Sequence, residues 1–180
     1  MVKIKNNVYI YLAVLLLLVP IPWLGAWLIA VAFHELCHYL FVRLFGGRVD
    51  RIVIGIGGAE MESTVLSEFQ CVVALLMGPV GGLLLTLLGR WLPRTALCSA
   101  LLSVYNLLPL SFLDGGRILL ILFGERTGRC IEQICLSVLS ALALHFVFAT
   151  GFGVLPIAIV AGLWLKKAKS SCKQDLFKVQ

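Results

Sequence analysis

The chain has 180 residues, of which 61% are hydrophobic and only 13% charged, and its mean hydropathy is +1.02. A soluble domain is about 45 to 50% apolar and about 25% charged, so this composition excludes a soluble globular protein and also a disordered one. The net charge of +6 comes from basic residues in loops and near the C-terminus. In a membrane protein such residues set the orientation, and they do not indicate nucleic acid as a partner.

Apolar runs separated by charges or by glycine and proline predict an all-α membrane protein. Each crossing needs about 20 apolar residues, so the chain accommodates about six transmembrane helices. We place these spans near residues 6–22, 24–45, 69–89, 95–113, 130–149 and 151–165. Only a few residues around Gly151 and Gly153 separate the last two runs. These runs form either two separate spans or one hairpin, so a total of five spans is the alternative to six.

The distribution of basic residues predicts the orientation of the spans. With six spans and both termini on one side, only Arg90 and Arg94 lie on the opposite side. Since basic loops stay in the cytoplasm, both termini are predicted to be cytoplasmic. Residues 1–165 then form one polytopic membrane domain, and residues 166–180 form a short basic cytoplasmic tail. The residues on the cytoplasmic side are Lys3, Lys5, Arg43, Arg48, Arg51, Arg117, Arg126, Arg129, Lys166, Lys167, Lys169, Lys173 and Lys178.

The segment between the second and third runs, residues 46–62, differs in character from the runs around it. It is rich in glycine and β-branched residues and alternates in the manner of strands, which predicts a short β-hairpin. Extended backbone near a bilayer must be shielded by protein or line a wet cavity. We therefore expect a membrane-associated hairpin that lies against the helices.

The second run contains the sequence His34-Glu35-Leu36-Cys37-His38. Residues four apart on a helix share a face, so the two histidines can bind one metal ion between them. The glutamate follows the first histidine, where a carboxylate can accept a proton from water at the metal, and this pattern is typical of zinc metalloproteases. Ionisable groups inside a membrane span are costly, which favours a functional role over that of buried structural histidines.

A catalytic zinc site needs a third protein ligand. Asp114 is the strongest candidate, because Pro109 breaks the fourth run just before it and two glycines follow it. His145 is a weaker alternative, near the outer end of the fifth run. Cys37 lies on the same helix face as the histidines and could in principle bind zinc, but a small side chain for close helix packing is the simpler role.

Two motifs together carry a resemblance to a known family. His34-Glu35-x-x-His38, followed by Asn106-x-x-Pro109 and Asp114-Gly115, resembles the site-2 protease family of intramembrane zinc metalloproteases, peptidase family M50. The resemblance extends from the first span to the sixth and is greatest to the branch of stage IV sporulation protein FB, whose substrate is a membrane-associated pro-sigma factor. Gly78-Pro79 in the third run is similar to a further motif of the family.

The resemblance implies a role for each matching residue. Residues His34, His38 and Asp114 would bind Zn²⁺, and Glu35 would be the catalytic acid and base. Asn106 and Pro109 would shape the substrate cleft. The glycine-rich hairpin, with Gly57 and Gly58, would bind the substrate through an edge strand by β-augmentation.

The expected substrate is a transmembrane or membrane-associated regulatory protein of the pro-sigma or anti-sigma factor type. The expected location is the plasma membrane or a forespore membrane, where membrane regulatory partners would control the enzyme. The chain departs from the family at Cys37, where a glycine is usual, and at Gly82, where an asparagine is common. No regulatory domain is expected after the last span.

Two other functions use the same residues. A metal transporter or metal-sensing membrane protein would need the histidines, but it does not explain why Glu35 follows His34, and neither inverted repeats nor a second polar span is visible. An inactive scaffold that binds partners would bind zinc without depending on Glu35.

Overall fold

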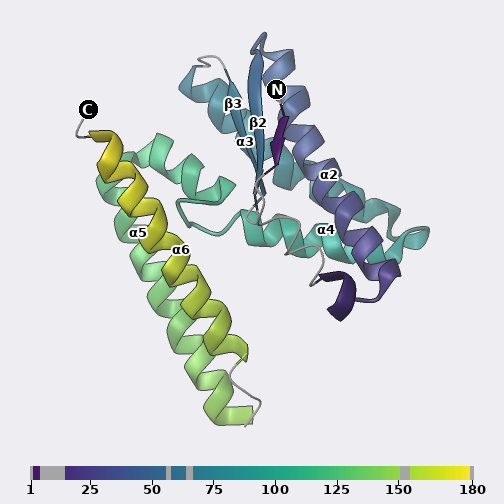
Figure 1. Ribbon diagram of the computed structural model, residues 1–180, viewed down its shortest axis with the longest axis vertical. Coiled ribbons are helices and arrows are strands. Elements are labelled where there is room, and N and C mark those ends of the chain that lie inside the picture. Colours follow the sequence, from purple (N-terminus) through teal and green to yellow (C-terminus); the bar gives the residue numbers. More distant parts are fainter. Residues whose placement is uncertain (1, 5–14, 56–57, 64–66, 151–154, 179–180) are drawn as a thin grey trace. The chain divides into compact units, whose positions relative to one another are not determined.

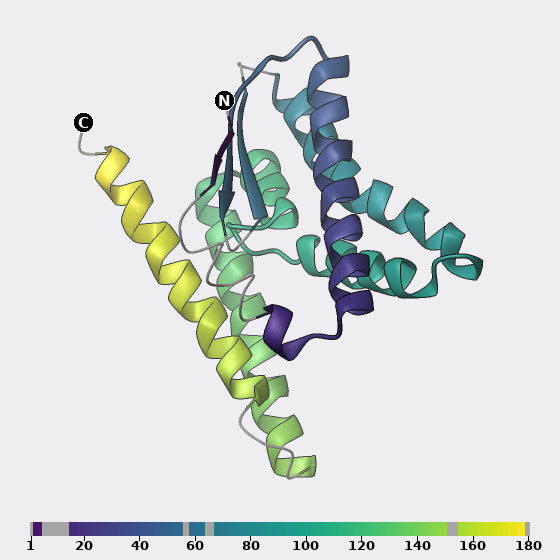
Figure 2. The same ribbon diagram turned by 45° about the vertical axis from the view of Figure 1, so that its right-hand side comes forward.

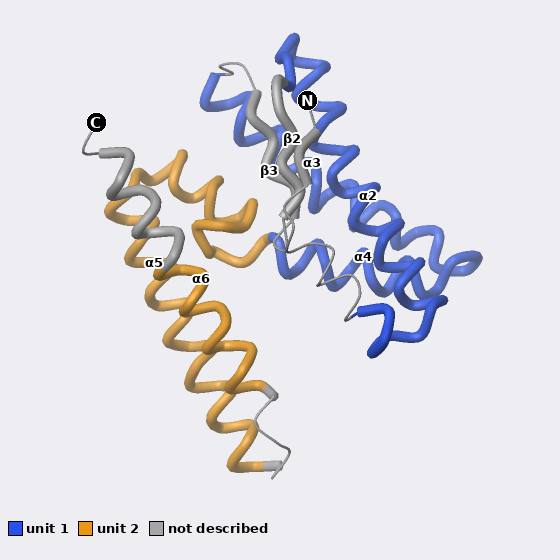
Figure 3. Tube along the Cα trace, in the orientation of Figure 1, with its two compact units in different colours: residues 1–106 blue, residues 107–180 orange. Residues whose placement is uncertain are grey.

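The computed structural model describes residues 2–4, 15–55, 58–63, 67–150 and 155–178. The chain divides into two compact units, residues 1–106 and residues 107–180 (Figure 3). Most of the predicted first span, and Gly57 of the predicted hairpin, lie outside the described residues. At the end of that span, residues 15–18 are helical.

Three helices form the body of the first unit: α2 (Ile21–Leu44), α3 (Glu68–Leu85) and α4 (Pro93–Asn106). A short 3-10 helix, η1 (Thr86–Arg90), connects α3 to α4. Each of the three helices contacts the other two (Figure 1). α2, which carries the two predicted histidine ligands, is therefore packed on two other helices within its own unit.

Local sequence explains where these helices begin and end. Pro22 lies in the first turn of α2, where its missing N–H is not needed. α2 ends at Leu44, Gly46 just beyond it has a φ of +78°, and the N–H of Gly47 donates to the carbonyl of Val42 at 2.9 Å, as in a Schellman motif. α3 begins with a capping box, in which Ser67 and Gln70 each accept a hydrogen bond from the other's backbone N–H.

A small sheet completes the first unit. Strand β2 (Val49–Gly55) pairs antiparallel with β3 (Gly58–Ser63), within the segment that was predicted to form a hairpin. Strand β1 (Val2–Ile4) adds to the other side of β2 in parallel, a pairing that the sequence did not predict. Figures 1 and 2 both show the three strands side by side, and β3 is an edge strand.

The second unit consists of a turn and two long helices, α5 (Asp114–Thr150) and α6 (Leu155–Lys178). α5 is interrupted at Gly124, whose φ of 77° and ψ of 169° are not helical, so the helix has a first arm, residues 114–123, and a second arm, residues 125–150. The second arm and α6 run side by side (Figures 1 and 2). α6 continues beyond the predicted span, through most of the predicted basic tail.

Within the described residues, three helical segments are long and apolar enough to cross a bilayer: Ile21–Leu44, Glu68–Arg90 and Asp114–Ala149. The first two agree with the predicted spans near 24–45 and 69–89, and the third contains the predicted span 130–149. The predicted span 95–113 is wrong as a single helix, because α4 ends at Asn106. Pro109 cannot donate a backbone hydrogen bond, and a helix of 14 residues is only about 21 Å long, shorter than the hydrocarbon core of about 30 Å.

Candidate metal centre

His34 lies on the buried face of α2. Ala26, Ala30 and His34 are spaced four apart and are all buried, and His34 is only 3% exposed. His38 follows one turn later and is half-buried, as is Glu35. Helical periodicity therefore places both histidines on the side of α2 that faces its neighbours.

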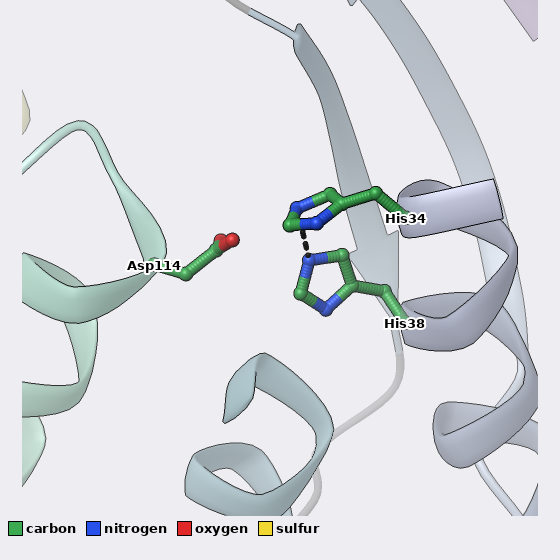
Figure 4. Close-up of side chains that lie close together, drawn as sticks. All are labelled: His34, His38 and Asp114. Atoms are coloured by element: carbon green, nitrogen blue, oxygen red, sulfur yellow. Dashed lines mark hydrogen bonds between the residues drawn. The ribbon is translucent and has the colours of Figure 1, made fainter. Parts of the chain in front are cut away.

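The two imidazole rings are held in a defined geometry. The Nδ1 of His38 lies 2.8 Å from the carbonyl oxygen of Ala74 in α3, and the Nε2 atoms of His38 and His34 lie 3.1 Å apart (Figure 4). A carbonyl only accepts, so Nδ1 of His38 donates to Ala74, and in the neutral ring Nε2 of His38 then carries the lone pair that can bind a metal. The ring planes are nearly perpendicular, at 87°.

This arrangement fits a metal ion. A metal-binding histidine usually donates its other ring N–H to a carbonyl or carboxylate, which fixes the tautomer, and His38 does so to Ala74. Two nitrogens bound to one tetrahedral zinc ion, at about 2.0–2.1 Å each, would lie about 3.3–3.4 Å apart. The observed 3.1 Å between the Nε2 atoms is close to that spacing.

The histidine rings occupy space that a glycine in α3 leaves open. A Cβ atom at Gly78 would lie 2.2 Å from Nε2 of His38 and 2.9 Å from Cε1 of His34. No side chain fits at this position without displacing a ring. Gly78 of the Gly78-Pro79 motif therefore allows α3 to approach the two candidate ligands closely.

Cys37 and Gly82, the two departures from the family pattern, are both involved in close helix packing. A Cβ atom at Gly81 would lie 2.3 Å from Sγ of Cys37, so the thiol packs directly on the backbone of α3. A Cβ atom at Gly82 would lie 2.2 Å from Oγ of Ser103 in α4. In addition, the hydroxyl of Ser99 donates to the carbonyl of Gly82 at 2.8 Å. At position 82 a serine-lined face of α4 takes the space that a larger residue would need.

The predicted substrate-binding residues have different surroundings. Asn106 is the last residue of α4, and its side-chain NH₂ donates to the carbonyl of Leu102 at 3.1 Å. Pro109 is half-buried in the turn that opens the second unit. Gly58 begins β3, next to the undescribed Gly57.

Asp114 is the first residue of α5, at the end of a tightly closed turn. A Cβ atom at Gly115 would lie 2.2 Å from the carbonyl oxygen of Leu107, and one at Gly116 would lie 2.0 Å from that of Leu110. The two glycines after Asp114 therefore let the backbone of the turn fold directly onto the start of the helix. His145, the alternative ligand, is exposed on the second arm of α5.

Glu132 is a buried polar residue that sequence reasoning did not single out. It lies on the second arm of α5, is only 4% exposed, and its Oε1 accepts hydrogen bonds from the backbone N–H and the hydroxyl of Ser111. An acidic residue inside a predicted span was the available signal, because such residues are rarely without a function. Its partner Ser111 lies in the turn before Asp114. No local sequence pattern connects this turn to Glu132.

Comparisons with known proteins are consistent with this geometry. The model of Peptidase family M50 matches residues 87–150. The fold is similar to that of the site-2 protease from Methanocaldococcus jannaschii, with a TM-score of 0.63 and 18% identity, over 93% of this chain and 89% of that one. The family match covers less than half of the chain, and the structural match shows similarity of fold. No curated protein matches the chain.

The match to Peptidase family M50 supports an intramembrane metalloprotease, and the three apolar helices agree with it. The matched segment, residues 87–150, contains Asn106, Pro109 and Asp114 but not the histidines, so the His34–His38 motif is a separate observation. A metallopeptidase requires a metal ion. In the first unit His34 and His38 each offer one ring nitrogen as a ligand, and in the second unit Asp114 offers a carboxylate oxygen (Figure 4).

Proposed function

We propose that the chain is an intramembrane zinc metalloprotease that cleaves a membrane-associated regulatory protein in or beside the bilayer. The observation that carries the proposal is the histidine pair of α2, with its Nε2 atoms 3.1 Å apart and Nδ1 of His38 bonded to the carbonyl of Ala74. A pair in which His34 is buried and the Nδ1 proton of His38 is held by a carbonyl is suited to metal binding. Zinc is the metal that the His34-Glu35-x-x-His38 motif favours.

In this proposal His34, His38 and Asp114 bind the ion and Glu35 acts on protons. Two imidazoles and one carboxylate form a common ligand set of catalytic zinc sites. A zinc ion held by these residues would supply Lewis acidity, which polarises carbonyls and lowers the pKa of water. The carboxylate of Glu35 would accept a proton from the attacking water and return it to the leaving amine, as general base and then general acid.

The substrate has to be extended before it can be cleaved. Carbonyls in a transmembrane helix are engaged in intrahelical hydrogen bonds, so we expect cleavage near a glycine, a proline or the membrane boundary. β3 is an edge strand and begins at Gly58, and it is the proposed place for the substrate to add a strand. Asn106, at the end of α4, and Pro109, in the turn before α5, would line the path to the site.

The proposed substrate class is a pro-sigma or anti-sigma factor. It rests on the resemblance of residues 106–109 and 113–116 to motifs of the branch of stage IV sporulation protein FB. The proposed topology has six spans with both termini in the cytoplasm, in a plasma or forespore membrane. Basic cytoplasmic loops would attract anionic lipids or acidic flanks of the substrate.

The proposal is tested by metal content and cleavage measured in the same preparations. Wild type is purified in detergent beside His34→Ala, Glu35→Gln and Asp114→Ala, zinc is quantified, and cleavage of a co-expressed single-span reporter is scored. We expect one zinc ion in the wild type, loss of zinc and cleavage in the His34 and Asp114 variants, and loss of cleavage alone in Glu35→Gln. Removing a general base lowers the rate by about 10²–10⁴-fold.

Other outcomes lead to different conclusions. Zinc retained in the Asp114 variant would exclude this carboxylate as a ligand and direct attention to Cys37 or His145. Zinc binding combined with unchanged reporter cleavage in Glu35→Gln would contradict the proposed proton transfer. A folded wild type that binds no zinc would favour a membrane scaffold.

A further inference from the structure

Glu132 connects the second arm of α5 to the turn that carries Asp114. The Oε1 atom of Glu132 lies 3.2 Å from the backbone nitrogen of Ser111 and 3.0 Å from its hydroxyl oxygen. Both groups donate, so one carboxylate oxygen accepts two hydrogen bonds from a single residue. Ser111 lies only three residues before Asp114 in the sequence.

The segment from Ser111 to Asp114 has little freedom to move independently. The N–H of Leu113 donates to the carbonyl of Leu110 at 2.8 Å, and the N–H of Arg117 donates to the carbonyl of Leu113 at 3.0 Å. A Cβ atom at Gly116 would lie 2.1 Å from the carbonyl carbon of Leu110 and 2.7 Å from the nitrogen of Ser111. A shift of Ser111 therefore changes the backbone directly before and after Asp114.

Apolar packing alone would be the simpler way to hold this turn. Leu110, Leu113 and Leu136 already form a buried cluster, and Leu136 lies one helical turn after Glu132. A carboxylate that is 4% exposed loses nearly all of its hydration, a cost that an apolar residue at the same position would avoid. What the carboxylate adds is direction, because hydrogen bonds to the N–H and the hydroxyl fix the rotation of Ser111 as well as its distance.

We propose that Glu132 is a positioning residue for the third metal ligand. Through Ser111 it fixes the turn from which Asp114 projects, so that the carboxylate of Asp114 is held in its binding orientation before the metal arrives. Residues that hold a metal ligand in position without binding the metal themselves typically contribute about 10- to 100-fold to metal affinity or activity. This inference rests on the proposed function, in which Asp114 is the third ligand.

The test uses the full chain in detergent and four substitutions. Glu132→Ala removes both hydrogen bonds, Glu132→Gln keeps an oxygen that can accept them, and Ser111→Ala removes only the hydroxyl bond. The matched control is Glu125→Ala, which removes an exposed carboxylate, paired with Arg129, from the same arm of α5. For each variant, Zn²⁺ affinity is measured by competition with a chromogenic chelator, and kcat and KM are measured on a single-span reporter that the wild type cleaves.

We expect Glu132→Ala to lower Zn²⁺ affinity and kcat by about 10- to 100-fold, with KM nearly unchanged. Glu132→Gln should restore most of both quantities, and Ser111→Ala should show a smaller decrease in the same direction. Glu125→Ala should match the wild type. A purely structural role would lower thermal stability but leave the affinity and kcat of the folded protein unchanged.

Wild-type Zn²⁺ affinity and kcat in folded Glu132→Ala would overturn the inference. If Glu132→Ala does not fold, Ser111→Ala decides, and wild-type affinity in that variant would overturn the inference equally. Asp114→Ala is measured in parallel to separate the two proposals. If Asp114→Ala keeps its zinc, the assignment of Asp114 as the third ligand fails, and the inference about Glu132 fails with it; if Asp114→Ala loses zinc while the Glu132 and Ser111 variants keep it, only the inference about Glu132 fails.

Discussion

The face of α3 that receives the histidines and the turn that precedes α5 both depend on glycine, but in different ways. At Gly78 the missing side chain leaves room for two imidazole rings, whose distal atoms would lie within 2.9 Å of a Cβ atom. At Gly115 and Gly116 it leaves room for backbone, with carbonyl oxygens 2.2 and 2.0 Å from the Cβ positions. The first region consists of packed regular helices, and the second is an irregular turn fixed by specific hydrogen bonds.

This difference indicates how each candidate ligand is held. Histidines on a regular helix obtain their relative position from helical geometry, and α3 needs only to leave space and offer one carbonyl. Asp114 follows a turn without a repeating pattern of hydrogen bonds, so its position depends on the contacts of Gly115, Gly116 and Ser111. A perturbation of the turn should therefore affect folding, whereas a perturbation of the α3 face should affect mainly the metal site.

Gly116→Ala should have the largest effect. The new methyl group would collide with the backbone of Leu110, which cannot rotate away as a side chain can. We expect a loss of stability in the upper part of the range of about 1–3 kcal/mol for overpacking, together with loss of zinc and cleavage. Thermal unfolding in detergent and zinc content would measure this. Gly162→Ala on α6, which has nothing within 4 Å of its Cβ position, is the control; equal stability of the two variants would refute the expected backbone collision.

Gly78→Ala should abolish zinc binding and cleavage with a smaller loss of stability. A Cβ atom would lie 2.2 Å from Nε2 of His38, and the imidazole can swing aside, which relieves the clash but misplaces the ligand. Zinc content, reporter cleavage and thermal unfolding would be compared with those of Gly25→Ala on α2, where nothing lies within 4 Å of the Cβ position. A Gly78 variant that keeps full zinc content would show that this face does not constrain the histidines.

Much of the histidine region could be predicted from the sequence, because it depends on helical periodicity. The spacing of His34 and His38 and the small residues of α3 are visible as patterns with a period of three to four residues. The pairing of β2 with β3 also follows from a local alternation of residue types. In each case the residues that define the feature lie close together in the sequence.

The turn region could be predicted only in part, because its contacts join distant residues. Pro109 and the two glycines indicated a break before Asp114, but they did not show that α4 ends as early as Asn106. The hydrogen bonds between Ser111 and Glu132 join residues 21 positions apart. The parallel addition of β1 to β2 is similarly non-local, and two residue patterns so far apart do not specify which strands will pair.

A double-mutant cycle at Gly82 and Ser103 should show an intermediate effect on stability alone. Gly82→Ala would place a methyl group 2.2 Å from Oγ of Ser103, so it should destabilise the α3–α4 contact. Ser103→Ala removes that oxygen and should relieve most of the clash, giving a coupling of about 1 kcal/mol between the two sites. Thermal unfolding of both single variants and the double variant would measure it. Simple additivity would show that the two side chains do not compete for the same space.

Gly124→Ala should have the smallest effect. At this position φ is 77° and ψ is 169°, a backbone conformation that is essentially restricted to glycine, although no atom lies within 4 Å of the Cβ position. The penalty is therefore backbone strain alone, and because the exposed joint can relax we expect it at or below the lower end of the usual range of about 1–3 kcal/mol. Because Glu132 and Ser111 still connect the second arm to the turn, zinc content should remain near that of the wild type while the melting temperature falls. A loss of zinc comparable to that in Gly116→Ala would mean that Asp114 is positioned by the joint between the two arms of α5, and not by the hydrogen bonds of its turn.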